Sequence, residues 1–381
     1  MDFGFSILLN RRIQPKTQEI VIRMVAKDEQ ITMLHGAGGT VMHDLIRNFI
    51  VKYLGETKSP GFVEVPLNAL DDAAVVDDIV LKSDSHAVKP IFFPGGDIGR
   101  LAISGTVNDI AVLGAEPVAL ACGLVLEEGL HLAELEQILK SMRDTCVEAG
   151  VGVVTGDTKV VEKGSLGGCV INVSGIGRRN DALEKNMAVV KKFRKSFHSR
   201  WILDSTLSVG DKIIVSGTIG DHGLAVLSAQ EGLSFGSGIK SDTKPLNHLI
   251  MRLLGEVGGI VSMKDPTRGG LADALTEFSD KSDVGILLEE GKVPIREDVK
   301  TACEMLGLDP FEVGNEGKVL IGMVKEKAEE ILTLLRSTEE GKDAEIIGEV
   351  TARFKGVAMQ TVVGGKRIIA RPVGDPVPRI C

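Results

Sequence analysis

Apolar positions follow two different periods along this chain, and the two periods alternate from one end to the other. Residues 132–149 carry apolar side chains at helical spacing, and Gly150 follows directly, as a glycine commonly does where a helix ends. Short apolar runs separated by glycine, aspartate and proline predict strands between such helices. Because strands and helices alternate throughout, the chain predicts an α/β or α+β fold.

The elements can be placed from these patterns. Strands are predicted at Asp71–Val76, Ile79–His86, Val151–Val154, Lys212–Ser216, Val319–Met323, Ile346–Val350 and Ala358–Val363. Helices are predicted from Val41 to Phe49, from Asp97 to near Gly114, and at Leu132–Ala149, Leu224–Gln230, Leu271–Phe278 and Lys325–Leu335.

With 381 residues the chain is long enough for two halves of similar size. Residues 178–204 differ from both halves because they are strongly basic and contain Trp201, the only tryptophan. Such a stretch usually indicates a solvated insert, and less often a docking surface. We therefore divide the chain into an N-terminal extension (1–30), an N-terminal domain (31–177), a basic insert or linker (178–204), a C-terminal domain (205–365) and a tail (366–381).

Composition excludes several classes of function. The net charge of −9 and an aromatic content of 4% argue against nucleic-acid binding. No uninterrupted apolar run is long enough to span a bilayer. The five cysteines are widely spaced and contain no CxxC pair, which fits a reducing cytoplasm better than a disulfide framework.

The tail ends in a cysteine, Cys381, after three prolines that prevent a helix or a central strand. An extended segment of this kind reaches about 3.1 Å per residue. A frayed terminus is the ordinary interpretation. The tail nevertheless contains hydrophobic residues and an arginine, so we expect a mobile arm that presents Cys381 to a site elsewhere.

Acidic residues indicate where that site lies. Asp109 falls on a largely apolar helix face, where a carboxylate is costly unless it is paired or binds a metal. Asp72 and Asp84 lie at the ends of predicted strands in the same half, and together the three acids favour a cation. Asp265 is either a helix N-cap or a further metal ligand.

Two glycine-containing segments could bind an anion. Gly38 and Gly39 precede a predicted helix, whose first N–H groups attract anions, although most such loops are only turns. Gly156-Asp157-Thr158-Lys159 follows a predicted strand, at a place where α/β proteins bind ligands, and a capped turn is the equal alternative. Separate aspartates with glycine-rich backbone fit Mg²⁺ and a nucleoside triphosphate, and therefore ATP-dependent phosphoryl transfer to an unspecified acceptor.

The chain resembles a known family along most of its length. The resemblance covers about residues 31–178 and 205–381, and is carried by HGAGG, LDDAAVV, SDSH, GTVNDIAVLGA, GDTKVV, GTIGDHG, DPTRGGL, GNEG and the final PRIC. These motifs are similar to those of the hydrogenase maturation HypE family, the carbamoyl dehydratases. That family is related to aminoimidazole ribonucleotide synthetase, thiamine-monophosphate kinase and selenophosphate synthetase.

The resemblance implies a two-domain synthetase-like fold. Its N-terminal half would dimerise through strands that build a shared β-barrel, with ATP in the dimer groove. It also implies that Cys381 receives a carbamoyl group from a HypF-like carbamoyltransferase and that ATP drives dehydration of this group to a thiocyanate. The cyanide would then pass to iron on a HypC–HypD scaffold, for the Fe(CN)2CO centre of [NiFe]-hydrogenase.

The resemblance also implies roles for single residues. Asp72, Asp109 and Asp265 are the Mg²⁺ candidates. The nucleotide contacts would be Asp84, Gly156, Asp157, Thr158, Gly38 and Gly39. Lys159 would hold phosphate oxygens or act as a base, and Glu316 is a second candidate base.

Two rival functions remain at this stage. Another ATP-dependent synthetase of the same superfamily would not need a cysteine on an arm. A non-enzymatic carrier, whose cysteine binds metal or docks on a scaffold, is weakened because no other Cys or His ligands cluster in the sequence.

Overall fold

The computed structural model describes residues 30–233, 238–374, 376–377 and 380–381, and the N-terminal extension therefore lies outside the described residues apart from residue 30. The first half contains a six-stranded sheet in the order β1-β2-β3-β8-β6-β7. The bounds of its strands are β1 Val63–Val65, β2 Ala74–Val76, β3 Ile79–His86, β6 Glu116–Glu127, β7 Val153–Val161 and β8 Cys169–Arg178. A short ribbon, β4 (Phe92–Phe93) with β5 (Gly96–Asp97), precedes the main helix of this half.

The second half contains a seven-stranded sheet in the order β10-β12-β9-β13-β11-β14-β15. The bounds of its strands are β9 Lys212–Val215, β10 Ile260–Lys264, β11 Gly285–Glu289, β12 Leu320–Met323, β13 Glu345–Thr351, β14 Gly356–Gln360 and β15 Lys366–Ile369. Most neighbours in it are antiparallel, and β11 pairs with β14 in parallel. Mixed strands and helices in two halves confirm the predicted α/β class.

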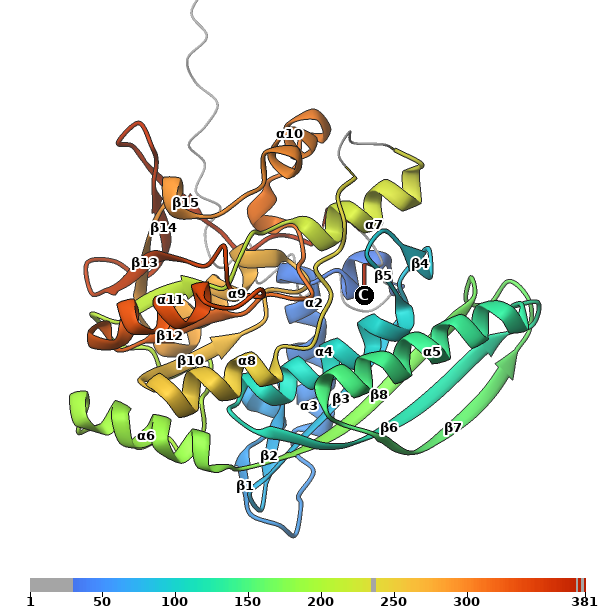
Figure 1. Cartoon of the computed structure of the whole chain (residues 1–381), viewed down its shortest axis with the longest axis horizontal. Coiled ribbons are helices and arrows are strands. Elements are labelled where there is room, and N and C mark those ends of the chain that lie inside the picture. The colour runs from blue at the N-terminus through green and yellow to red at the C-terminus, as the bar shows by residue number, and fades with distance from the viewer. Residues whose placement is uncertain (1–29, 234–237, 375, 378–379) are drawn as a thin grey trace, which may run out of the picture.

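The helices lie around these sheets, as Figure 1 shows. Their bounds are α2 Gly39–Leu45, α3 Lys52–Leu54, α4 Ile98–Val112, α5 Leu132–Ala149, α6 Asp181–Phe193, α7 Asp221–Glu231, α8 Asn247–Arg252, α9 Gly270–Ser282, α10 Glu297–Leu306 and α11 Ala328–Arg336. Six-residue and five-residue π-helical segments follow α2 (Ile46–Val51) and α8 (Leu253–Val257). No described helix has both the length and the apolar composition that a membrane crossing requires.

Helix α4 is the central element of the first half. The carboxylate of Asp97 accepts hydrogen bonds from the amides of Gly99 and Arg100, which confirms the predicted N-cap. The helix packs against α5, β3 and β8, and every residue in it except Arg100 is buried. An all-round buried helix leaves its one carboxylate, Asp109, no route to bulk water except through a cavity.

The predicted β-barrel is not present within the chain. The six-stranded sheet is open, with β1 at one edge and β7 at the other, so the described residues of one chain form no closed barrel. The prediction concerned a barrel shared by two chains, and a single chain leaves that part of it a prediction.

The basic segment 178–204 is packed rather than solvated. Asn180 caps α6 by accepting a hydrogen bond from the amide of Leu183, and Leu183, Met187 and Val190 face the main apolar cluster. Trp201 is 2% exposed, and the guanidinium of Arg179 lies 4.9 Å from its ring centroid. The lysines lie on the outer face of an amphipathic helix, which explains why the composition suggested a linker.

The predicted tail is shorter than residues 366–381. Lys366–Ile369 form β15 and pair with β14 at the edge of the second sheet, where Ile369 is buried. Val377 and Ile380 are buried in the apolar cluster around α4. Figure 1 shows the end of the chain in the middle of the molecule, near α2. The tail therefore turns inward in this structure.

Candidate active site

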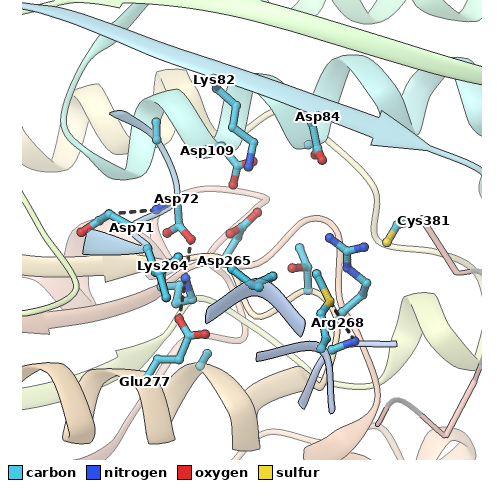
Figure 2. A pocket seen from close by; sticks show the side chains of 18 of the residues that line it. Asp71, Asp72, Lys82, Asp84, Asp109, Lys264, Asp265, Arg268, Glu277 and Cys381 are labelled. Atoms are coloured by element: carbon cyan, nitrogen blue, oxygen red, sulfur yellow. Dashed lines mark hydrogen bonds and ion pairs between the residues drawn. The ribbon is translucent and has the colours of Figure 1, made fainter. Parts of the chain in front are cut away.

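A cavity of about 540 Å³ lies between the two halves and is lined from both of them. The first half contributes residues of α2, β3 and α4. The second half contributes the end of β10, the start of α9, Glu316 and Cys381. Figure 2 shows the charged side chains of these elements pointing toward one another.

Three carboxylates meet in this cavity. Asp72 lies just before β2, Asp109 in the last turn of α4, and Asp265 just after β10. One oxygen of each lies within 4.8 Å of the others. Burial raises the pKa of Asp109 to about 7, although the nearby Lys82 opposes this, and burial with the charges of Asp109 and Asp72 raises the pKa of Asp265 well above its usual range.

The geometry of this carboxylate group fits Mg²⁺. All three donors are oxygens, which is the ligand type that Mg²⁺ prefers. Asp72 Oδ2 is buried and has no hydrogen-bond partner among the described residues, so this oxygen is available to a ligand. The sequence predicted these three residues as the metal ligands, and the structure brings them together from three separate elements.

Two lysines form ion pairs with two of these carboxylates, Asp109 and Asp72. Lys82 Nζ, from β3, lies 2.6 Å from Asp109 Oδ2. Lys264 Nζ, the last residue of β10, pairs with Asp72 Oδ1 and lies 3.0 Å from Glu277 Oε2. The sequence reasoning missed both lysines. A signal was present in both strands, because Lys82 directly follows the apolar run Ile79–Leu81 and Lys264 ends the largely apolar strand β10.

Cys381 lines the same cavity at the side of Arg268, as Figure 2 shows. The pKa of Arg268 is raised, chiefly by the negative charge of Cys381 and further by Asp84 and Glu316. The sequence reasoning also missed Arg268, although it lies in the DPTRGGL motif. The thiol that was predicted to reach a site elsewhere is therefore placed at the site of the carboxylates.

Glu316 is 3% exposed and lines the cavity near Arg268. Its Oε1 is buried without a hydrogen-bond partner among the described residues. Burial raises the pKa of Glu316 well above its usual range, and the charges of Asp265 and Asp242 raise it further. A buried carboxylate with such a pKa is a stronger base, once ionised, than one in water.

Asp84 also faces the cavity, from β3. Burial raises the pKa of its carboxyl, but the charges of His86, Lys82 and Arg268 outweigh burial, so the pKa is lowered. Asp84 Oδ2 lies 3.4 Å from His86 Nε2. The residue is thus an ionised carboxylate at the cavity wall, and its contact with the nucleotide stays a prediction.

The glycine-rich loop is arranged differently from the prediction. The amide of Gly38 donates to Met42 Sδ at 3.3 Å, and the amide of Gly39 donates to Asp273 Oδ2 at 3.1 Å. The amide of Thr40 donates to the carbonyl of Pro372 at 2.9 Å. These N–H groups have protein acceptors in this structure, and the start of α2 binds the base of the tail where a phosphate was expected.

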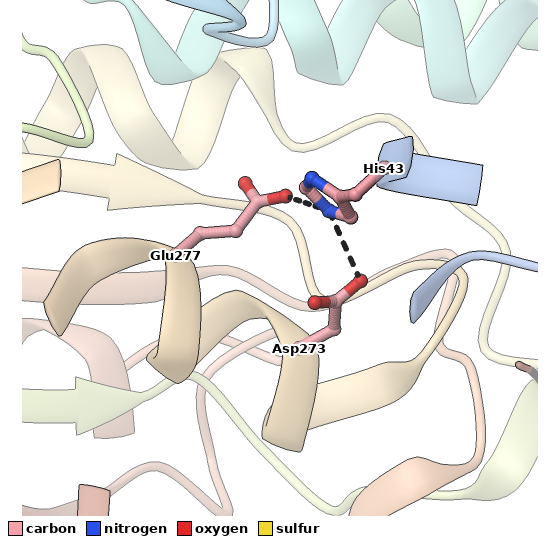
Figure 3. Close-up of side chains that lie close together, drawn as sticks. All are labelled: His43, Asp273 and Glu277. Carbon is pink, nitrogen blue, oxygen red and sulfur yellow. Dashed lines mark ion pairs between the residues drawn. The ribbon is translucent and has the colours of Figure 1, made fainter. Parts of the chain in front are cut away.

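A second cluster lies where α2 packs on α9. His43 Nε2 is 2.9 Å from Glu277 Oε1 and 3.7 Å from Asp273 Oδ2, as Figure 3 shows. Hydrogen bonds to Asp273 and Glu277 raise the pKa of His43. The cations Lys264 and Arg371 already pair with the two carboxylates, so this cluster is a neutralised ion-pair network.

The remaining predicted residues lie outside the cavity. Gly156, Asp157, Thr158 and Lys159 are in β7, which the sequence predicted to end at Val154. The strand continues because Val160 and Val161 pair with the end of β6. The Lys159 side chain is 72% exposed, 3.5 Å from Asp157 Oδ2. Within one chain, the structure does not bring this segment to the carboxylates.

Comparisons with known proteins agree on one group. Two models of AIR synthase related proteins match, the N-terminal domain at residues 70–179 and the C-terminal domain at 208–360. A protein of Methanocaldococcus jannaschii, provisionally named a hydrogenase expression/formation protein, is 48% identical over 92% of this chain and 100% of its own length. The carbamoyl dehydratase HypE of Azotobacter vinelandii is 40% identical over 94% of this chain and 99% of its own.

Solved structures give the same result. A HypE chain from a HypE–HypF complex matches with a TM-score of 0.76 and 43% identity, covering 86% of this chain and 99% of that one. A HypE solved in complex with ATP matches with a TM-score of 0.72 and 39% identity, covering 92% of this chain and 100% of that one.

Proposed function

This chain belongs to the carbamoyl dehydratase HypE family, within the AIR synthase related proteins, and from that premise we propose which of its residues carry the reaction. It is an ATP-binding carbamoyl dehydratase of hydrogenase maturation. The observation that carries the residue assignment is the position of Cys381, which lines the same cavity as the three grouped carboxylates.

Asp72, Asp109 and Asp265 would hold Mg²⁺, and Lys82, Lys264 and Arg268 surround them with positive charge. A bound Mg²⁺ supplies charge neutralisation for a transferring phosphoryl group. The phosphates of ATP would then lie among these cations. The apolar side chains of Ile46, Ile50, Leu67 and Leu81 line the mouth of the cavity and would face the rest of the nucleotide.

The reaction converts an S-carbamoyl group on Cys381 to a thiocyanate. The carbamoyl oxygen attacks the γ-phosphorus of ATP, the bond to ADP breaks, and the oxygen becomes part of a phosphate leaving group. One proton leaves the nitrogen as the carbon–nitrogen double bond forms. The second leaves with the phosphate, which gives the triple bond, ADP and inorganic phosphate.

Arg268 and Glu316 are suited to these steps. Arg268 lies beside Cys381 and would hold the negative charge that develops on the carbamoyl oxygen. Glu316 would accept a nitrogen proton, because its raised pKa makes the ionised carboxylate a stronger base. Asp84 would contact the nucleotide from the β3 side of the cavity.

Lys159 and its neighbours would act on a second chain. The backbone and side chains of β7 are exposed from Val153 to Val160, and β7 pairs only with β6 among the described strands. Val154 and Val160 are 72% and 69% exposed, which is an apolar edge that a homodimer would cover. A shared β-barrel at this edge would bring Lys159, Gly156, Asp157 and Thr158 to the cavity of the partner chain.

The relative solved as a HypE–HypF complex suggests the loading partner. We propose that a HypF-like carbamoyltransferase places the carbamoyl group on Cys381, and that a HypC–HypD iron scaffold receives the cyanide. The tail must leave the cavity for both exchanges, because the side chains of Val377 and Ile380 that precede the thiol are buried.

Intact mass spectrometry tests the function. The protein is incubated with the carbamoylating partner and carbamoyl phosphate, and ATP with Mg²⁺ is added afterwards. We expect one carbamoyl adduct that loses the mass of one water on ATP addition. Cys381→Ala should gain no adduct, and Asp109→Asn should gain the adduct and keep it.

Two results would contradict the proposal. An adduct on the Cys381→Ala protein would place the carbamoyl group on another residue. An adduct on the wild-type protein that survives ATP would make the chain a carrier with no dehydratase step.

A further inference from the structure

His222 is buried at the end of the tail and has no part in the chemistry proposed above. It lies in the first turn of α7 and is 0% exposed. Phe93 meets its ring edge-on, with centroids 5.4 Å apart and an interplanar angle of 90°. The side chain is therefore held in one orientation by packing.

One ring nitrogen of His222 binds the tail. Nε2 lies 2.7 Å from the carbonyl oxygen of Ile380. Because a carbonyl oxygen only accepts, Nε2 carries the proton and donates. Nδ1 is therefore the acceptor, and it lies 2.8 Å from Ser241 Oγ and 3.3 Å from Thr243 Oγ1, either of which can donate to it. Burial lowers the pKa of His222, which keeps the ring neutral and preserves this pattern.

The residue that His222 holds is also packed tightly. Ile380 is 1% exposed, and it belongs to the apolar cluster around α4. Ile380 packs closely on Gly314: a Cβ added there would lie 2.5 Å from Ile380 Cδ1 and 2.9 Å from the carbonyl oxygen of Thr267. The end of the tail thus occupies a site that fits both its carbonyl and its side chain.

The base of the tail is held separately. Arg371 Nε lies 3.2 Å from Asp273 Oδ1, and the amide of Thr40 donates to the carbonyl of Pro372 at 2.9 Å. A Cβ on Gly39 would lie 2.3 Å from Pro372 O, in a backbone conformation with φ +67°. The tail is therefore held at both ends, by α2 and α9 at its base and by α7 near its last residue.

We propose that His222 is a positioning residue for the dehydration: by holding the carbonyl of Ile380, it fixes where Cys381 presents its sulfur to Arg268 and Glu316. That carbonyl belongs to the peptide group directly before Cys381. Once this group is fixed, rotation about the N–Cα and Cα–Cβ bonds of Cys381 is all that moves the sulfur. Restricting a reacting group in this way raises the fraction of molecules in a productive geometry.

The inference rests on the proposed function, in which Cys381 bears the reacting group. A matched pair of variants separates positioning from packing. In His222→Gln the side-chain amide nitrogen reaches roughly the place of Nε2 and can still donate to Ile380. In His222→Asn the shorter side chain replaces Nδ1 and loses the donor to the tail. Both variants lose the ring that packs on Phe93.

The first measurement needs no activity. Cys381 is alkylated with iodoacetamide in the full-length protein, and peptide mass analysis reports the rate at this thiol alone. Losing one hydrogen bond is expected to raise the rate in His222→Asn by about fivefold to tenfold, while His222→Gln stays near the wild-type rate. Ser241→Ala keeps the ring and removes the nearer hydroxyl at Nδ1, while Thr243 Oγ1 remains 3.3 Å away, so it should show a smaller rise in the same direction.

The second measurement uses the carbamoylated protein. In His222→Asn the rate constant for ATP-dependent loss of water should fall about tenfold with the KM for ATP unchanged, and His222→Gln should recover most of it. Equal rates of alkylation in the wild type and His222→Asn would overturn the proposal. So would equal losses in Gln and Asn, because they would reflect only the missing ring.

The two proposals fail in different ways. If the wild-type protein gains no carbamoyl adduct, the assignment of Cys381 as the substrate residue fails, whatever the alkylation rates. If the wild type completes the reaction but the His222 variants behave alike, only the positioning role fails.

Discussion

The carboxylates Asp72, Asp109 and Asp265 were predicted to bind Mg²⁺, and the Gly156–Lys159 segment in β7 was predicted to contact the nucleotide. The structure places the first group inside the cavity and the second outside it. Asp109 and Asp265 are 6% exposed and are held by elements that pack on all sides. Lys159 is 72% exposed on an edge strand. A single chain brings the three carboxylates together in its cavity, whereas its Gly156–Lys159 segment lies on an exposed edge strand outside that cavity.

The difference follows from how each segment is supported. The carboxylates come from a helix end and two strand ends that the core holds in place. Because they repel one another, binding of a cation between them is favourable. Strand β7 has its free hydrogen-bonding edge and its valines exposed to solvent, so pairing of this edge with another chain is favourable. Under the proposed function, Mg²⁺ would complete the cavity at the carboxylates, and a second chain would complete it through β7.

The largest expected effect comes from Asp109. Asp109→Asn removes one negative charge from the proposed Mg²⁺ ligands and breaks the ion pair with Lys82. ATP turnover should therefore fall on the order of a thousandfold. Nucleotide binding measured by calorimetry should lose its Mg²⁺ dependence. Asp144→Asn, which changes an exposed aspartate of α5, should leave both unchanged. Wild-type turnover in Asp109→Asn would remove this residue from the site.

The next effect concerns Lys159. Lys159→Ala should lower ATP turnover roughly a hundredfold, as expected for the loss of one charged group at a transferring phosphate. If Lys159 acts on the partner's cavity, mixing the inactive Lys159→Ala and Asp109→Asn proteins creates dimers with one intact site. The mixture should recover about a quarter of wild-type turnover, since half of the dimers are mixed and half of their sites are intact.

No recovery on mixing would mean that Lys159 acts on its own chain or not at all.

The proposed dimer contact at the edge of β7 can also be disrupted directly. Val154→Asp places a charge in the proposed interface and should give a monomer by sedimentation, with turnover reduced as in Lys159→Ala. A Val154→Asp protein that remains dimeric would place the interface on another surface.

The smallest effect lies in the cluster that attaches α2 to α9. Hydrogen bonds to Asp273 and Glu277 raise the pKa of His43, while burial and Arg371 oppose them. The stabilisation by protonated His43 is therefore complete below about pH 6.5, the ordinary pKa of histidine, and is lost as pH rises through the raised value. In His43→Gln this part of the pH dependence should disappear, at a cost of about 1 kcal/mol at low pH.

Thermal melts between pH 5.5 and 9 measure this change. His198→Gln alters an exposed histidine and serves as the control. If His43→Gln melts in parallel with the wild type at every pH, the ion pairs of His43 do not hold α2 in place.

Local pattern was sufficient for some elements and missed others, among them the long strands β6 and β8 of the first sheet. Helix α5 has the predicted bounds, Leu132–Ala149, because its apolar stripe and its final glycine are local signals. Strand β3 also has its predicted bounds, Ile79–His86. Strand β7 was predicted too short, because polar residues in an edge strand look like a loop when no neighbour is known.

Burial could not be read from composition in the same way. The lysines and arginines of residues 178–204 suggested a solvated insert, yet α6 buries Leu183, Met187 and Val190 against the core. Gly38 and Gly39 suggested a phosphate loop, yet the amide of Gly39 binds Asp273. In both cases the local sequence indicated the type of backbone segment. It gave no information about which surface the segment packs against or which acceptor its amides bind.

The sequence by itself indicated the alternating fold and drew attention to Cys381, because both depend on residue types at local positions. The three Mg²⁺ candidates came from the resemblance of its motifs to a known family. Only the tertiary structure decided that Lys82, Lys264 and Arg268 share the cavity and that the tail turns inward onto His222. It also decided that the residues of β7 are exposed outside that cavity. These facts join residues far apart in the chain. Such contacts are set by packing of whole elements, which no local pattern records.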